Sequence, residues 1–168
     1  MLYKILNNLH QYCHFDSAAA HCDIPCKIYD PISAQLAALS VLRFLDLIGD
    51  LEQQASLSLE EQAKRMRLVN EKETHAAKVK EEVRIIWGDF FKQVQIDQQP
   101  DIHTLVHNIM LSASACKQSI KRENGEQLLD LVNQFAGSFW RAKNIKTYRS
   151  ICPYPPSEEL VYPLLERK

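Results

Sequence analysis

Four stretches of the chain repeat apolar residues at the spacing of an amphipathic α-helix, and this pattern constrains the fold more than any other feature. The first stretch runs from about Ile32 to Asp50, the second from Ser58 to Phe90, and the third from Asp101 to Ile120. The fourth follows a charged turn expected at Asn124-Gly125 and ends near Trp140. Each such helix has one apolar face that must be buried. Four of them with short connections predict an all-α fold, a four-helix bundle.

Local signals support these boundaries. Ser58-Leu59-Glu60-Glu61 has the spacing of a capping box, in which Ser58 and Glu61 satisfy each other's backbone N–H groups. The residues between Glu60 and Arg84 are dense in charges of both signs, which indicates a solvated helix face. Gln98-Gln99-Pro100-Asp101 interrupts the helical pattern. Cys116, among small residues, is expected to be packed in the core.

Composition excludes several classes of protein. A length of 168 residues suits one domain with a core, and only four glycines argue against a turn-rich all-β fold. The net charge of -1 gives no electrostatic case for nucleic acid as a partner. Since no stretch reaches the roughly 18 apolar residues that span a bilayer, no membrane partner is expected.

The two ends of the chain differ from the helical part. Residues 1–20 end in Ser17-Ala18-Ala19-Ala20 and carry Asn7, Asn8 and His10 where a signal peptide needs an apolar run. We therefore interpret them as a propeptide removed in place, with an export signal as the alternative. Together with scattered, odd-numbered cysteines, this predicts a cytoplasmic protein. Residues 147–168 form a Pro-rich tail that is docked on the bundle, docked on a neighbouring subunit, or mobile.

Residues 21–31 form an irregular hook between the leader and the first helix, and the hook contains a possible metal site. If the chain begins at His21, its α-amine, the amide nitrogen of Cys22 and the Cys22 thiolate close two adjoining five-membered chelate rings in one plane. Cys26 can return through the turn at Pro25 to the fourth corner, and the His21 imidazole is left as an axial ligand. A planar set of N and S donors suits Ni(II), whereas tetrahedral sulfur sites suit zinc.

The donors also indicate redox chemistry. Amidate and thiolate are strong electron donors, so they stabilise the higher oxidation state of the metal and lower its potential. A Cys-x-x-x-Cys pair alone is a weak signal, because it also fits chance, a disulfide or half a zinc site. The neighbouring His21, the small residues just before it and Pro25 within the loop favour the metal site.

The hook, His21-Cys22-Asp23-Ile24-Pro25-Cys26-Lys27-Ile28-Tyr29-Asp30-Pro31, resembles that of the nickel superoxide dismutases, His-Cys-Asp-x-Pro-Cys-Gly-x-Tyr-Asp-Pro. Two later segments, Trp87-Gly88-Asp89-Phe90-Phe91-Lys92 and Pro100-Asp101-Ile102-His103-Thr104-Leu105-Val106, are similar to segments of the same family. Phe139-Trp140 matches the end of its last helix. The resemblance spans roughly residues 21–143.

This resemblance implies a superoxide dismutase, an oxidoreductase that converts superoxide to dioxygen and hydrogen peroxide at one Ni2+/Ni3+ ion per subunit. It implies metal ligands from His21, Cys22 and Cys26, and a substrate pocket shaped by Asp23 and Tyr29. It further implies a homohexamer of four-helix bundles, with a maturation protease that cleaves between Ala20 and His21. The expected organisation is a propeptide (1–20), a dismutase domain (21–146) and the tail (147–168).

The chain departs from the family pattern at several positions around the ligands. Lys27 replaces a glycine, which costs strain if the backbone needs a positive φ there, although its charge could help attract superoxide. Phe90 replaces a tyrosine. Ala37 and His75 stand where the family has a Glu and Arg pair that orients the axial imidazole, and His75 is either a substitute or a solvated helix residue. The competing hypothesis is a non-catalytic zinc- or copper-binding or metal-sensing helical protein.

Overall fold

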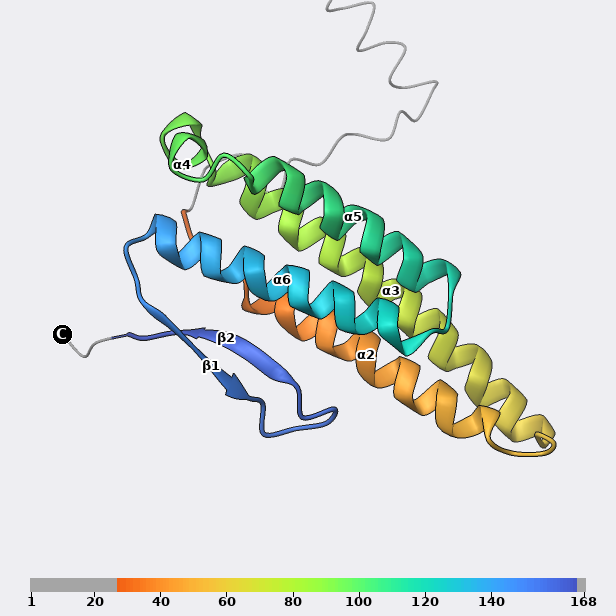
Figure 1. Cartoon of the computed structure of the whole chain (residues 1–168). Helices are drawn as coiled ribbons and strands as arrows, with labels where there is room; N and C mark the ends of the chain where they lie inside the picture. The colour runs from red at the N-terminus through yellow and green to blue at the C-terminus, as the bar shows by residue number, and fades with distance from the viewer. Residues whose placement is uncertain (1–26, 166–168) are drawn as a thin grey trace, which may run out of the picture.

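The computed structural model describes residues 27–165, and it divides this part of the chain into five helices and two strands. The elements are α2 (Ile32–Glu52), α3 (Leu59–Asp89), α4 (Gln93–Gln98), α5 (Ile102–Gln118), α6 (Arg122–Ala142), β1 (Thr147–Ile151) and β2 (Glu159–Pro163). The four long helices lie side by side and alternate in direction, as Figure 1 shows. The fold class predicted from apolar periodicity, a four-helix bundle, is confirmed.

The core lies where α2 packs against α3 and α6, and where α5 packs against α3 and α6. Most of the residues predicted to point inward are buried, including Leu42, Val83, Ile109 and Phe135. Helix α2 alone, among the described residues, is long and apolar enough to cross a membrane. Its apolar side chains instead contact α3 and α6, as expected for a core helix of the bundle.

The loop from α2 to α3 ends in the predicted capping box. The Ser58 Oγ accepts a hydrogen bond from the Glu61 backbone N–H at 3.3 Å, and the Glu61 carboxylate accepts one from the Ser58 backbone N–H at 2.8 Å. These contacts satisfy two of the backbone donors that a helix N-terminus leaves without partners. The boundary of α3 predicted from the Ser-x-x-Glu spacing is therefore confirmed.

One lysine of the charged stretch is not on a solvated face. Lys72 is 1% exposed, and its Nζ donates to the backbone oxygens of Cys116, Lys117 and Ser119 at 2.5, 3.1 and 2.8 Å. These carbonyls belong to the C-terminal end of α5, where a helix has unsatisfied acceptors and partial negative charge. Lys72, which lies on α3, therefore caps the C-terminal end of the neighbouring helix α5. The prediction that this lysine lies on a solvated face is wrong.

The turn predicted at Asn124-Gly125 is also wrong, because both residues lie in the first turn of α6. Gly125 is buried where α6 crosses α2, and a Cβ on it would lie 2.7 Å from Leu45 Cδ1 and 2.9 Å from Leu42 Cδ1. The glycine is thus needed for close helix packing. The turn itself lies between α5 and α6, at residues 119–121.

One short helix and a two-stranded hairpin were not predicted. The six-residue helix α4 lies between the second and third long helices. The Pro-rich tail forms an antiparallel hairpin in which Tyr148 pairs with Tyr162 and Ser150 with Leu160. Strand β2 contacts α6 and buries Leu160 and Val161, so the described part of the tail, residues 147–165, is docked on the bundle of its own chain.

Candidate metal centre

The predicted hook enters the structure at the end of the bundle where α3 and α6 end and α5 begins (Figure 1). Residues 27–30 are irregular, and α2 starts after Pro31. The Asp30 carboxylate accepts a hydrogen bond from the Ile32 backbone N–H at 2.8 Å, and the Pro31 carbonyl accepts one from Gln35 at 3.0 Å. These contacts fix how residues 27–30 join the start of α2.

Tyr29 is the one predicted site residue that lies in the described part of the chain. It is half-buried, and its ring lies 6.3 Å from that of Phe90. Phe90 in turn lies 4.7 Å from Phe139, measured between ring centroids. The hook's first described aromatic residue therefore rests on residues from the ends of α3 and α6.

Lys143, which directly follows α6, brings a positive charge to this aromatic cluster. Its Nζ lies 5.2 Å from the ring centroid of Phe90 and 5.1 Å from that of Phe139, within the range of a cation–π interaction. The helical pattern gave no sign of this contact. Its only sequence signal is that Lys143 comes three residues after Trp140, the end of the matched Phe139-Trp140 segment.

Lys27 has a φ of 58°, in the left-handed region that favours glycine. The strain expected where lysine replaces the family's glycine is thus present, at a cost of about 1 kcal/mol or more. The side chain is exposed, so its charge is directed to solvent rather than into the core.

Two segments that carried the family resemblance meet at the same end of the bundle. The Trp87 indole N–H donates to Nδ1 of His103 at 3.0 Å, and the two rings meet edge to face at 5.6 Å. Because Nδ1 accepts this hydrogen bond, the neutral His103 ring carries its proton on Nε2. The C-terminal turns of α3 are thereby tied to the start of α5.

The positions of the family's Glu and Arg pair do not converge on Tyr29. Ala37 is buried in the core, and the Nδ1 of His75 hydrogen-bonds to the carbonyl of Glu71 on its own helix at 2.9 Å. His75 also contacts Phe44, with ring centroids 5.3 Å apart. It precedes Asp89 by fourteen residues on α3, which is about 20 Å of helix. This arrangement favours the interpretation of His75 as an ordinary helix residue.

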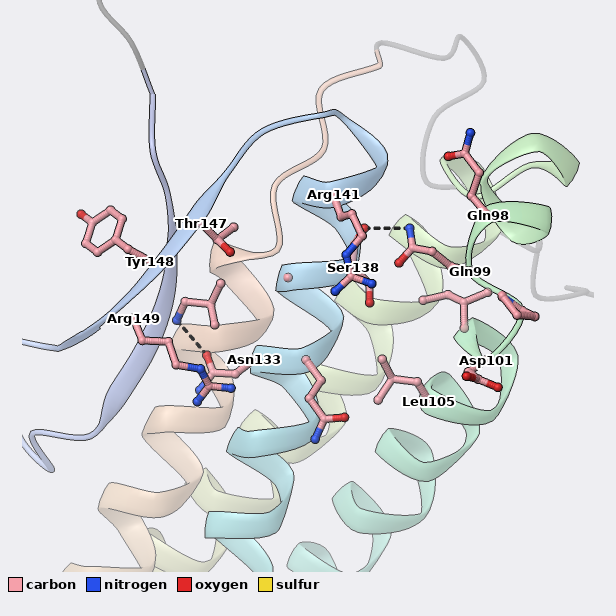
Figure 2. A pocket seen from close by; sticks show the side chains of 15 residues that line it. Gln98, Gln99, Asp101, Leu105, Asn133, Ser138, Arg141, Thr147, Tyr148 and Arg149 are labelled. Atoms are coloured by element: carbon pink, nitrogen blue, oxygen red, sulfur yellow. Dashed lines mark hydrogen bonds between the residues drawn. The ribbon is translucent and has the colours of Figure 1, made fainter.

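His21, Cys22, Asp23 and Cys26 lie outside the described residues. Within residues 27–165 no group of three or more His, Cys, Asp or Glu side chains could hold a metal ion. Cys116 and Cys152 are both buried free cysteines. A cavity of about 690 Å³ between α5, α6 and the hairpin is lined by Gln99, Arg141, Arg149 and other mainly polar residues (Figure 2). Within residues 27–165, therefore, no second donor set competes with the nickel ligands that the sequence predicts in the hook.

Comparison with known proteins supports the family predicted from the sequence of the hook. The family model for nickel-containing superoxide dismutase matches residues 16–143. The chain belongs to this family. The nickel superoxide dismutase of Streptomyces seoulensis is 33% identical over 125 residues, which are 74% of this chain and 89% of that protein. That of Streptomyces coelicolor is 31% identical over 127 residues, 76% of this chain and 91% of that protein.

A solved native nickel superoxide dismutase has 30% sequence identity to this chain and superposes with a TM-score of 0.65, covering 74% of this chain and 99% of that structure. Membership brings an oxidoreductase activity on superoxide and a nickel cofactor, as the hook predicted. The alternative of a non-catalytic zinc or copper protein is not favoured. The match ends at residue 143, so the hairpin of β1 and β2 lies beyond it.

Proposed function

We propose that the chain is cleaved between Ala20 and His21, and that the new N-terminus then holds one nickel ion per subunit and dismutates superoxide to dioxygen and hydrogen peroxide. The main support is that the family match covers the hook and the bundle together, from residue 16 to residue 143. Before cleavage the His21 nitrogen is a peptide amide and cannot serve as an amine ligand.

Three residues would hold the metal. His21 would contribute its α-amine and imidazole, Cys22 its amide nitrogen and thiolate, and Cys26 a second thiolate. Loaded nickel supplies a one-electron couple that can both oxidise and reduce superoxide. Loading requires that the amide and both thiols lose protons, so nickel binding should weaken as the pH falls.

Residues around the ligands would control access and attract substrate. Asp23 and Tyr29 are proposed to shape the substrate pocket, with the Tyr29 hydroxyl limiting access to the metal. The Lys143 ammonium contacts the ring of Phe90, which also packs against Tyr29, and it would raise the local concentration of an anion such as superoxide. Superoxide dismutases are a known example of such steering.

We further propose a cytoplasmic homohexamer that has neither nucleic acid nor membrane as a partner. A net charge of -1 and the interrupted apolar run of the leader support this environment. Large apolar side chains stay exposed on α3 and α5, with Leu59, Met66 and Leu111 exposed by 83%, 73% and 57%. Exposed apolar side chains on long helices are suitable for contacts between subunits. Light scattering on the purified protein should give six times the mass of the mature chain.

The intact mass and the metal content of the purified protein test the ligand set. We expect a chain that begins at His21, a stoichiometric amount of nickel, and dismutase activity that disappears when nickel is removed. Cys22→Ser should lose both nickel and activity, whereas Ser119→Ala, at the far end of the bundle, should keep both. A protein that retains residues 1–20 and still dismutates superoxide at full rate would contradict the proposed ligands.

A further inference from the structure

The C-terminal hairpin is the part of the described chain that family membership does not explain, because it follows the last matched residue. Strand β2 has β1 on one edge and the bundle on the other. The edge of a strand carries backbone N–H and C=O groups that need partners once they are buried. The side of β2 that faces the bundle must therefore find those partners on α2 or α6.

A single side chain on α6 takes the place of a pairing strand. The Asn133 carboxamide donates to the Glu159 carbonyl at 2.8 Å and accepts from the Val161 N–H at 3.1 Å (Figure 2 shows the second contact). Its donor and acceptor thus reproduce the two hydrogen bonds that a neighbouring strand would make to alternate residues of β2. Asn133 is 3% exposed, so these bonds are shielded from water.

Gln35 extends this contact to α2. Its Nε2 donates to Asn133 Oδ1 at 3.0 Å and to the Val161 carbonyl at 2.9 Å, and the residue is 1% exposed. Leaving a buried carboxamide without partners costs about 1–3 kcal/mol. A hairpin that covered the two amides in any other register would leave some of these groups buried without a partner, so Gln35 and Asn133 specify its docked position.

The position of Gln35 links the hairpin to the hook. Gln35 closes the first turn of α2 through its backbone bond to Pro31, and it comes nine residues after Cys26 in the chain. We propose that the hairpin acts as a clamp on this first turn, so that Gln35 and Asn133 are positioning residues for the nickel hook. This inference rests on the proposed function of the hook.

The other end of the hairpin provides a matched control. Arg122 donates to Glu158 at 2.8 Å and to Asp46 at 2.7 Å, which ties the hairpin loop to α6 and to the far half of α2. Glu158→Gln should weaken this tie without disturbing the first turn of α2. Variants at these two contacts therefore distinguish the effect of hairpin docking in general from an effect on the hook.

Hydrogen exchange on the full metal-free chain tests the clamp directly. In the double variant Gln35→Met with Asn133→Leu, which replaces both amides by apolar side chains of similar size, we expect the backbone amides of residues 32–36 and 159–162 to exchange at least tenfold faster. Amides in the middle of α3 should not change, and Glu158→Gln should leave residues 32–36 protected. Gln35→Met alone, a milder change, should give a smaller effect at the same amides if the double variant does not fold.

Dismutation by the nickel-loaded variants then tests positioning. We expect the double variant to bind nickel stoichiometrically, since every donor is intact, but to lose several-fold in kcat/KM, whereas Glu158→Gln should match the wild type. Unchanged exchange at residues 159–162 would overturn the clamp. Unchanged exchange at 32–36 with a loosened hairpin, or full activity with a loosened first turn, would overturn the positioning role. If Cys22→Ser still binds nickel, the proposed ligand set fails instead.

Discussion

Lys72 on α3 donates a 2.5 Å hydrogen bond to the backbone carbonyl of Cys116, in the last turn of α5. The lysine carries no buried carboxylate partner among the contacts described for it, and its three hydrogen bonds all go to carbonyl oxygens. Burial lowers the pKa of Lys72. The partial negative charge at a helix C-terminus offsets part of the cost of burying the ammonium group.

Lys72→Met should destabilise the protein by about 2–4 kcal/mol, because it leaves three carbonyl oxygens at the end of α5 without a donor. Urea unfolding of the metal-free protein, followed by circular dichroism, measures this difference. Lys78→Met, on an exposed position of the same helix, is the control and should stay within about 0.5 kcal/mol of the wild type. Equal midpoints for the two variants would contradict the role of Lys72.

The thiol of Cys116 should be inert in the folded protein. The residue is 0% exposed, and burial raises the pKa of its thiol to about 11, so almost no thiolate forms at pH 8. We expect iodoacetamide to modify Cys116 about a hundredfold or more slowly than a free cysteine, as measured by peptide mass mapping. Full modification without urea would show that α5 opens readily, whereas modification in urea is the positive control.

Gly125→Ala should destabilise the bundle by about 1–3 kcal/mol, because the new methyl group would overlap Leu42 and Leu45 of α2. Gly137 lies on the same helix and has no neighbouring atom within 4 Å of an added Cβ. Gly137→Ala should therefore stabilise the protein by about 0.5–1 kcal/mol through helix propensity alone. Thermal unfolding of the two variants should move in opposite directions, and a shift of the same sign would contradict the crossing at Gly125.

Acid should weaken the N-terminus of α3. Hydrogen bonds from the Ser58 side chain and backbone lower the pKa of Glu61. Between the folded and unfolded pKa values the unfolded chain binds more protons, so this contribution is present above the unfolded pKa and is lost as the pH falls through the folded pKa. Ser58→Ala should lower the unfolding midpoint at pH 7 and have a smaller effect near pH 3. An effect independent of pH would contradict the pairing with Glu61.

The sequence was sufficient for the helices because their evidence is local. Apolar spacing and the Ser58-to-Glu61 box depend on residues within one or two turns of each other. The prediction of a turn at Gly125 is wrong because glycine is common both in turns and where two helices pack closely. Only the position of α2 against α6 distinguishes the two cases. The burial of Lys72 likewise depends on α5, more than forty residues further along the chain.

The hairpin could not be predicted from the sequence for a different reason. All five residues of β1 are exposed, so the strand has no alternation of apolar and polar residues to reveal it. Its docking depends on Gln35 and Asn133, which are 98 positions apart. At the site, the metal donors remain a prediction from the motif, because they lie outside the described residues, whereas the contact of Lys143 with Phe90 depends on the folded bundle.

The register of the hairpin brings the end of the described chain back to the end of the bundle where α6 ends. Thr147 pairs with Pro163, and the Leu164 N–H donates to the Lys146 carbonyl at 2.8 Å, only three residues beyond Lys143. If nickel binds in the hook as proposed, a polyhistidine tag added at the C-terminus would offer imidazoles that compete for it. An N-terminal tag would be lost if the leader is cleaved as proposed, so the mature protein should be purified without a tag, or with one that binds no metal.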